Sequence, residues 1–405
     1  MHWATCHCRN KHCERCGKMG RTSALQPHGS DRGEGRFRCT ACGQVVSART
    51  GTAYAGIRTD LTQYALGAKL LAEGLGIRAT ARILEVDKDT VNHWLVYLGT
   101  HGGAVMAYHF RHLHLTECQL DELWTFVMKK EAQLTPLERM LDLHGDTWVW
   151  IAFAPISKLV PAWVAGKRTR QESKMLIQRL QSSTDGYIPF FTSDELPHDA
   201  AALLEVYGQT IVPPHTGKPG RPRNSYKVPP DDLLYAVVCK RRERGRVVEV
   251  TTHVVYGTPE RITQALADSP VLSVISTFGV ERNNLTIRQH ARRLGRKVNA
   301  FSNDHAYLED QLALSFAYYH FIVPHLGLRQ RLAPPLPTKG SGSPKRWLQR
   351  TPAMAAGLTD HIWTMDELLS FRVPPRFVWS STPNRQTCGV PHYRDTTDAC
   401  SCADC

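Results

Sequence analysis

The sequence has no long hydrophobic run, which argues against a membrane-spanning protein. The longest nearly unbroken apolar stretch, residues 148–156, is far shorter than the ~20 residues that cross a bilayer. The first residues turn basic and contain no apolar core of a secretory signal, so we expect a cytoplasmic protein without membrane contact. Hydrophobic residues make up 42% of the 405 residues, which excludes a disordered chain and allows two or three domains.

Acidic residues are scarce relative to basic ones. The chain has 37 Asp and Glu against 50 Lys and Arg, a net charge of +13, which favours a polyanionic partner, although some enzymes are simply basic. The distribution of the cations is more informative. Residues 282–297 carry six cations and no acid, and residues 218–246 carry nine cations against three acids. Such clusters are typical of proteins that bind nucleic acid.

Cysteine is almost absent from the middle of the chain. Of the twelve cysteines, six lie in residues 1–42 and four in residues 388–405. In a reducing compartment, clustered cysteines indicate a metal site before a disulfide. Two C-x2-C-G knuckles, 22 residues apart, would supply four thiolates to a structural Zn²⁺ ion. The predicted zinc ligands are Cys13, Cys16, Cys39 and Cys42.

These knuckles predict a zinc ribbon over residues 1–52. A pair of redox CxxC motifs is the alternative, but no thioredoxin-like pattern surrounds them. Cys6, His7 and Cys8 are left over as spare or alternative ligands. The segment is basic, so we expect it to contact DNA or to dock a protein.

Residues 58–100 predict three helices. Apolar residues recur at helical spacing over residues 61–73, 77–84 and 88–98, with a short turn between the last two. A short helix, a tight turn and a helix with a polar start form the plan of a helix-turn-helix, although any three-helix packing unit would look similar. The side chains predicted to face the major groove are Lys88, Asp89, Thr90, Asn92 and His93.

The next segment, residues 113–325, predicts an α/β domain. Three strands come first, followed by a helix, a strand and a helix, which is the order of an RNase H-like fold. These elements span residues 115–127, 147–154, 158–164, 169–181, 187–194 and 199–207. A further helix is expected over residues 306–323.

Three carboxylates stand at prominent places in this domain. Asp121 lies inside a strand, Asp194 ends another, and Glu281 lies on the amphipathic segment 280–298. Arg288 and Arg292 would lie within about 20° of Glu281 on a helix, so a simple ion pair is one interpretation. Alternatively, the three carboxylates would hold Mg²⁺ or Mn²⁺ for an in-line phosphodiester displacement.

A basic insertion is expected at about residues 211–256. Residues 220–223, Gly-Arg-Pro-Arg, are similar to the core of an AT-hook, with Arg221 and Arg223 in the minor groove. A plain surface loop explains them as well. Residues 233–239 and 247–255 predict a hairpin whose turn would be the basic stretch 240–246.

Four sequence blocks carry a resemblance to a known family. They are Cys-Gln-Leu-Asp-Glu-Leu-Trp at 118–124, Phe-Thr-Ser-Asp at 191–194, Val-Glu-Arg-Asn-Asn-Leu-Thr-Ile-Arg-Gln-His at 280–290 and Arg-Leu-Gly-Arg-Lys-Val-Asn-Ala-Phe-Ser at 293–302. These blocks resemble the catalytic blocks of DDE insertion-sequence transposases, in particular the insertion-sequence-one family. That family also places a zinc ribbon and a helix-turn-helix upstream, so the resemblance covers roughly residues 10–320.

The resemblance implies that Asp121, Asp194 and Glu281 are a DDE triad that binds Mg²⁺ or Mn²⁺. Glu122 and Glu195 follow the two aspartates directly and are the competing candidates. The implied activity is metal-dependent strand cleavage and strand transfer at the ends of an insertion sequence. The cations expected to hold DNA phosphates are Arg288, Arg292, Arg296 and Lys297.

The implied partners are terminal inverted repeats and target DNA, which a homo-oligomer, at least a dimer, would bind in the nucleoid. Two alternatives stay open: a nuclease or resolvase on the same fold, and a non-catalytic DNA-binding regulator. Residues 333–344 predict a linker, and residues 345–405 a C-terminal module with a cysteine-rich tail to which no chemistry is assigned.

Overall fold

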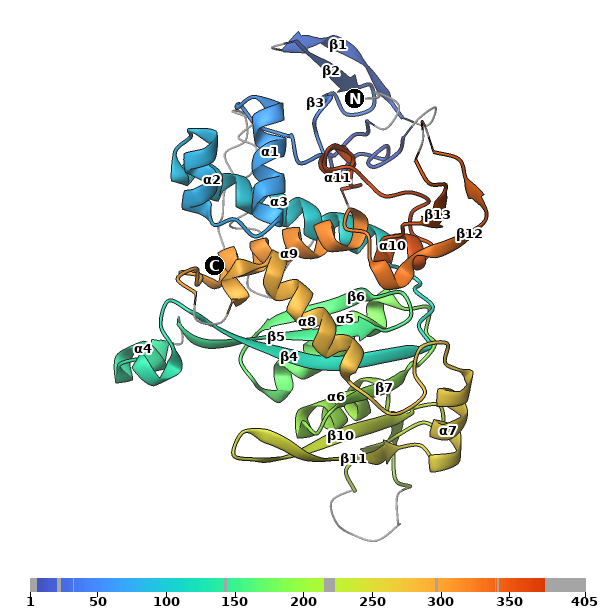
Figure 1. Cartoon of the computed structure of the whole chain (residues 1–405). Coiled ribbons are helices and arrows are strands. Elements are labelled where there is room, and N and C mark those ends of the chain that lie inside the picture. The colour runs from blue at the N-terminus through green and yellow to red at the C-terminus, as the bar shows by residue number, and fades with distance from the viewer. Residues whose placement is uncertain are drawn as a thin grey trace.

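The computed structural model describes residues 6–19, 23–31, 33–141, 144–214, 223–295, 298–338, 340 and 342–375. A small N-terminal sheet leads into three helices, which pack against one of the helices that cover a central mixed sheet (Figure 1). The C-terminal segment then returns to the N-terminal part. The protein is therefore an α/β chain of several parts.

The N-terminal sheet is antiparallel, with its strands in sequence order. The glycine after each knuckle, Gly17 and Gly43, has φ of +73° and +75°, as the tight C-x2-C turn requires. The strands are β1(Leu25–Asp31), β2(Glu34–Cys39) and β3(Val45–Ser47).

Three helices follow, as the apolar spacing predicts, and aspartates cap the first and third. Asp60 accepts hydrogen bonds from two backbone N–H groups of α1, and Asp87 accepts one from α3. The third helix differs from its prediction, because it continues eleven residues beyond Leu98. The helices are α1(Leu61–Ala72), α2(Ile77–Leu84) and α3(Lys88–His109).

Glycines explain this extension of α3. Gly99 and Gly102 let α3 pack closely against α9(His305–Phe321), the long helix over the central sheet. A Cβ on Gly99 would lie 2.4 Å from the Cα of Asp310. Buried residues of α1 and α3 therefore share one core with α9, and the predicted segment 58–100 is packed onto the α/β part.

We expect Gly99→Ala to destabilise the protein, because the new methyl group would push α3 away from the α9 backbone. Overpacking of this kind costs about 1–3 kcal/mol in the free energy of unfolding, measurable by urea denaturation. Gly76→Ala is the control, since its Cβ would meet nothing within 4 Å and its cost should stay below about 1 kcal/mol. Equal effects of the two substitutions would contradict the close packing.

The central sheet has six strands in the order β11-β10-β7-β4-β5-β6. β4, β5 and β6 form the predicted antiparallel meander, whereas β7 runs parallel to β4 and β10 parallel to β7. The strands are β4(Glu117–Val127), β5(Gly145–Ala154), β6(Leu159–Gly166), β7(Phe190–Asp194), β10(Tyr235–Glu243) and β11(Arg246–Tyr256).

Helices cover both faces of this sheet (Figure 1). α5(Arg170–Ser183) and α6(Pro197–Tyr207) lie on one face, and α8(Phe278–His290) and α9 lie on the other. The smaller elements are η3(Glu131–Gln133), α4(Pro136–Leu141), β8(Gln209–Ile211), β9(Tyr226–Val228), α7(Pro259–Asp268), η4(Arg292–Leu294) and η5(Leu326–Leu328).

Two predicted boundaries are wrong, and both affect the site. The stretch 240–246 is not a turn, because β10 continues to Glu243 and only residues 244–245 connect it to β11. The helix predicted over 280–298 ends at His290, and η4 follows it. Arg292 therefore does not share a helix with Glu281.

The C-terminal segment links the N-terminal part to the helices. Part of the predicted linker 333–344 is strand, since it includes the end of β12. Ala53 N–H donates to Leu369 O at 2.9 Å, and Val373 N–H donates to Gly51 O at 3.1 Å. The elements are β12(Gln330–Leu336), β13(Lys345–Leu348), α10(Pro352–Ala355) and α11(Met365–Ser370). The cysteine-rich tail predicted at residues 388–405 lies outside the described residues.

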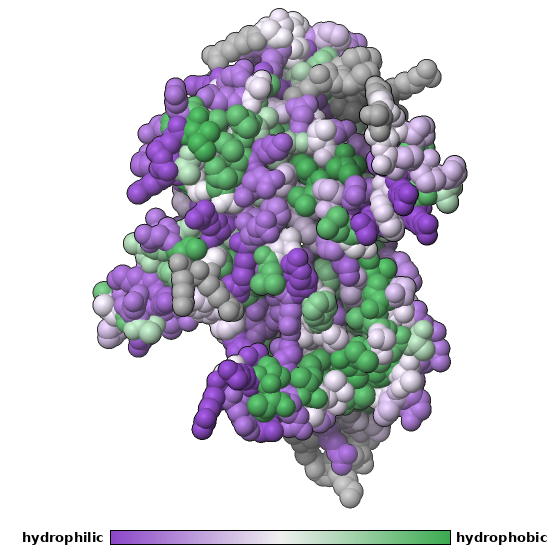
Figure 2. Space-filling view, viewed as in Figure 1, coloured by the Kyte–Doolittle hydropathy of each residue, from purple (hydrophilic) through white to green (hydrophobic). Residues whose placement is uncertain are grey.

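The face shown in Figure 2 is largely hydrophilic and carries several apolar patches. Leu66 and Ile83 are exposed on α1 and α2. Among the described residues, the structure has no helix both long and apolar enough to cross a membrane.

Candidate active site and candidate zinc centre

Two of the three predicted carboxylates lie side by side on neighbouring parallel strands. Leu120 of β4 pairs with Ser193 of β7, so the next positions along the two strands are Asp121 and Asp194. The sheet register therefore brings together two acids that are 73 residues apart in the sequence.

Helix α8 places the third carboxylate, Glu281, over the same sheet face. Gln119, two residues before Asp121, fixes the start of α8 with both ends of its amide. Its Nε2 donates to Ser276 O at 2.7 Å, and its Oε1 accepts from Val280 N–H at 2.8 Å. Glu281 therefore lies in the first turn of a helix that is anchored to the strand of Asp121.

The hydroxyl of Thr277 lies between Asp194 and Glu281. Its Oγ1 is 3.1 Å from Asp194 Oδ1 and 2.9 Å from Glu281 Oε1. Thr277 is buried, so its position is fixed by the fold. The two carboxylates thus converge on one polar group.

Asp121 is held by two hydrogen-bond donors. Asn284 Nδ2 donates to Asp121 Oδ2 at 2.6 Å, and the Glu122 N–H donates to Asp121 Oδ1 at 2.8 Å. Burial raises the pKa of Asp121 to about 7, and the charges of Glu122, Asp194 and Glu281 add to the increase. The three predicted carboxylates are therefore close enough to influence one another electrostatically.

A lysine that the sequence analysis did not identify completes this cluster. Lys240 Nζ donates to both carboxylate oxygens of Asp194, at 3.0 and 3.3 Å, and also to Glu281. Burial alone would lower the pKa of Lys240, but the bonds to Glu281 and Asp194 outweigh it and raise the pKa. Burial would likewise raise the pKa of Glu281, but Lys240 and Thr277 lower it.

The competing acids lie elsewhere. Glu122 is on the opposite sheet face, as strand alternation predicts, and forms an ion pair with Arg168. Arg168 in turn stacks over the Trp148 ring, 4.6 Å from its centroid. Glu195 is exposed and interacts with Cys239. Neither glutamate joins the carboxylate cluster.

A buried polar network supports the sheet from this opposite face. Asp199, at the start of α6, accepts a hydrogen bond from Ser173 Oγ at 2.8 Å and interacts with Ser193. Ser193 Oγ lies 2.7 Å from Tyr235 Oη. Burial raises the pKa of Asp199 to about 7, despite the bonds from the two serines.

This shift predicts a pH-dependent stability. The folded-state pKa of Asp199, about 7, lies above its ordinary value of 3.8, so the acid favours the folded state at low pH and this contribution is lost as pH rises to about 7. The amide introduced by Asp199→Asn is neutral throughout this range. The stability of Asp199→Asn relative to wild type should therefore increase by roughly 2 kcal/mol between pH 5 and pH 8, measured by urea denaturation. A difference that does not change with pH would contradict the buried, protonated acid.

Of the cations predicted to contact DNA in this domain, the structure describes Arg288, Arg292 and Arg223. Arg288 is on α8 and donates to Leu294 O at 2.9 Å, whereas Arg292 is exposed on η4. Arg223 is exposed. Arg221, Arg296 and Lys297 lie outside the described residues.

The predicted DNA-reading residues gather at the start of α3. Lys88 and His93 are exposed, and Thr90 and Asn92 are half-buried. Lys88 forms an ion pair with Asp89 at 3.0 Å, so the Asp89 carboxylate partly offsets the positive charge of Lys88 at this surface. The neighbouring helix α2 adds two exposed cations, Arg78 and Arg82.

The N-terminal segment brings four cysteines together, but they are not all the predicted ones. The Sγ atoms of Cys8, Cys13, Cys39 and Cys42 lie within 4.8 Å of one another. Cys8 takes the place predicted for Cys16, because the chain folds back so that Gly17 N–H donates to Cys8 O at 2.9 Å. The sequence had left Cys8 open as an alternative ligand, but the C-x2-C spacing favoured Cys16.

The geometry of the four thiols fits a zinc ion. Sγ atoms are 3.5 Å apart for Cys8 and Cys42 and 3.9 Å apart for Cys13 and Cys39. Zn–S bonds of ~2.3 Å in a tetrahedron separate the sulfurs by about 3.8 Å. These four cysteines could bind a structural zinc.

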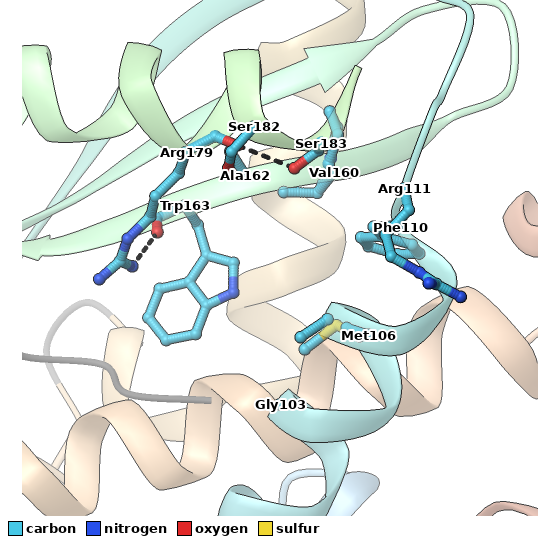
Figure 3. A pocket seen from close by; sticks show the side chains of 12 residues that line it. Gly103, Met106, Phe110, Arg111, Val160, Ala162, Trp163, Arg179, Ser182 and Ser183 are labelled. Atoms are coloured by element: carbon cyan, nitrogen blue, oxygen red, sulfur yellow. Dashed lines mark hydrogen bonds between the residues drawn. The ribbon is translucent and has the colours of Figure 1, made fainter. Parts of the chain in front are cut away.

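A separate cavity of about 290 Å³ lies between α3, β6 and α5 (Figure 3). Met106, Phe110 and Trp163 line its apolar part, and Arg179 donates to Trp163 O at 2.8 Å. The cavity does not include any of the carboxylates of the candidate active site.

Comparisons with protein-family models, with curated proteins and with solved structures found no match to this chain.

Proposed function

We propose that this protein is a DNA transposase that cleaves and joins DNA strands at the ends of an insertion sequence. The observation that carries the proposal is the convergence of Asp121, Asp194 and Glu281 from two strands and a helix onto one sheet face. Their resemblance to the catalytic blocks of DDE transposases gives the same three residues.

The topology of the central sheet supports an RNase H-like assignment. Three antiparallel strands are followed by two strands parallel to the first, with the acids at the centre, on β4 and β7. In this interpretation β11 is an addition that extends the sheet at its edge.

The donor set fits hard divalent cations, because carboxylate oxygens are the ligands that Mg²⁺ and Mn²⁺ prefer. When bound, such ions activate the attacking oxygen and stabilise the leaving oxygen of a phosphodiester displacement. Within the chain, Asn284 donates to Asp121, and the Thr277 hydroxyl lies within hydrogen-bonding distance of both Asp194 and Glu281. Arg288, farther along α8, would hold a DNA phosphate.

DNA recognition is assigned to the helices and the N-terminal sheet. α2, the turn at residues 85–87 and α3 follow one another as in a helix-turn-helix, and Asn92 and His93 near the start of α3 would read base edges. The exposed Arg78 and Arg82 would contact phosphates. Because transposition must act on two element ends, we expect at least a dimer on DNA.

The test is a strand-transfer assay with the purified full chain, Mg²⁺ and DNA from the ends of its own element. Cleavage at the ends and joining to target DNA would support the proposal. Cleavage without joining would instead indicate a nuclease or resolvase. Specific binding without cleavage would indicate a regulator.

A further inference from the structure

Lys240 is placed among the carboxylates by the sheet itself. Val238 of β10 pairs with Asp194 of β7, and Lys240 lies two residues farther along the same strand. Side chains two residues apart in a strand share a face, so Lys240 projects on the Asp194 face. Its ammonium group therefore reaches the carboxylates from a regular strand.

The side chain of Lys240 is also well enclosed. Only 18% of it is exposed, against 47% for Asp194 and 45% for Glu281. A buried ammonium group is costly unless it is paired, and Thr277 Oγ1, at 3.3 Å, is its only additional close polar contact among the described residues. Lys240 is thus bound between the same two carboxylates that the proposed function assigns to a divalent cation.

We propose that Lys240 is a built-in competitor of the divalent cation: its ammonium group occupies the position between Asp194 and Glu281 and must leave it when the cation binds. This inference rests on the proposed function. The ammonium group and a divalent cation bind the same carboxylate oxygens, so each weakens the binding of the other.

The charge balance gives the direction of the effect. With all groups ionised, three carboxylates and one ammonium group carry a net charge of −2, and the same cluster without Lys240 carries −3. Lys240 therefore weakens cation binding twice, by occupying the oxygens and by lowering the negative charge. With this competition, the catalytic site would bind its cation only when the cation is abundant or when another group, such as a DNA phosphate, draws the ammonium group of Lys240 away.

The experiment measures Mn²⁺ binding to the full chain at pH 8, from the electron paramagnetic resonance signal of free Mn²⁺. We expect Lys240→Met to lower the dissociation constant at least about tenfold, because a neighbouring positive charge is removed. Arg241→Met is the matched control. Arg241 is the next residue of β10 and forms ion pairs with Glu243 and Glu249, away from the site, so its loss should leave Mn²⁺ affinity unchanged.

Two further variants make the outcome decisive. Asp194→Asn should abolish the Mn²⁺ site; if it does not, the proposed catalytic metal site fails, and this inference fails with it. If Mn²⁺ binding depends on Asp194 but is unchanged or weaker in Lys240→Met, only the competitor role of Lys240 is overturned. Lys240→Gln, which keeps a polar side chain, serves as a second variant should the methionine variant fold poorly.

Discussion

Asp121→Asn, Asp194→Asn and Glu281→Gln should each abolish DNA cleavage and joining while DNA binding remains intact. Each change removes one carboxylate oxygen and its charge at nearly constant volume. Loss of a ligand to a catalytic cation removes several kcal/mol of transition-state stabilisation, so we expect rates to fall about a thousandfold or more. The measurement is cleavage and strand transfer of labelled end DNA, with binding followed separately by gel shift.

The matched controls are the neighbouring acids. Glu122→Gln and Glu195→Gln remove carboxylates one residue away, but Glu122 faces Arg168 across the sheet and Glu195 is exposed. Both variants should keep most of their activity, although Glu122→Gln removes the ion pair with Arg168. An inactive Glu122→Gln with an active Asp121→Asn would show that the wrong member of the pair had been assigned.

Sequence patterns predicted correctly those helices and strands whose structure depends mainly on residues near one another in the chain. Alternation along β4 placed Asp121 and Glu122 on opposite faces, and the helical spacing of apolar residues located α1, α2 and the start of α3. In these segments each residue's position depends mainly on neighbours within four residues.

The errors arose where distant segments decide the structure. The third helix was predicted to end at residue 98, but Gly99 and Gly102 allow it to continue in close packing against α9. Lys240 was assigned to the basic turn predicted at residues 240–246, yet its pairing with Val250 of β11 keeps it in a strand. In the sequence, only the two-residue spacing from Val238 indicated the sheet face of Lys240. That spacing could be interpreted only once the parallel register of β10 and β7 was known.

The cysteine cluster shows the same limit. The C-x2-C spacing indicated a site of four thiols, but the identity of the fourth ligand depends on how the first residues fold back on the knuckle. Cys8 is buried beside Cys42, whereas Cys16 is only half-buried. No spacing rule distinguishes a ligand five residues before Cys13 from one three residues after it.

Zinc analysis of two serine variants should therefore give opposite results. We expect one zinc per wild-type chain, loss of that zinc in Cys8→Ser, and retention of it in Cys16→Ser. A structural zinc site contributes on the order of 10 kcal/mol to folding, far more than the short N-terminal sheet can supply from its largely exposed strands. The Cys8→Ser variant should consequently lose the fold of residues 6–52, and limited proteolysis should cut it there.

The rest of the molecule should resist the protease, because the core of α1, α3 and α9 does not include the cysteines. The contacts from Leu369 and Val373 to the N-terminal part would be lost with that part. Zinc content by mass spectrometry and the proteolytic pattern are measured on the same samples. Zinc lost from Cys16→Ser but kept in Cys8→Ser would restore the ligand set that spacing alone predicts, and zinc kept in both would mean that another ligand, such as Cys6 or His7, replaces the missing thiolate.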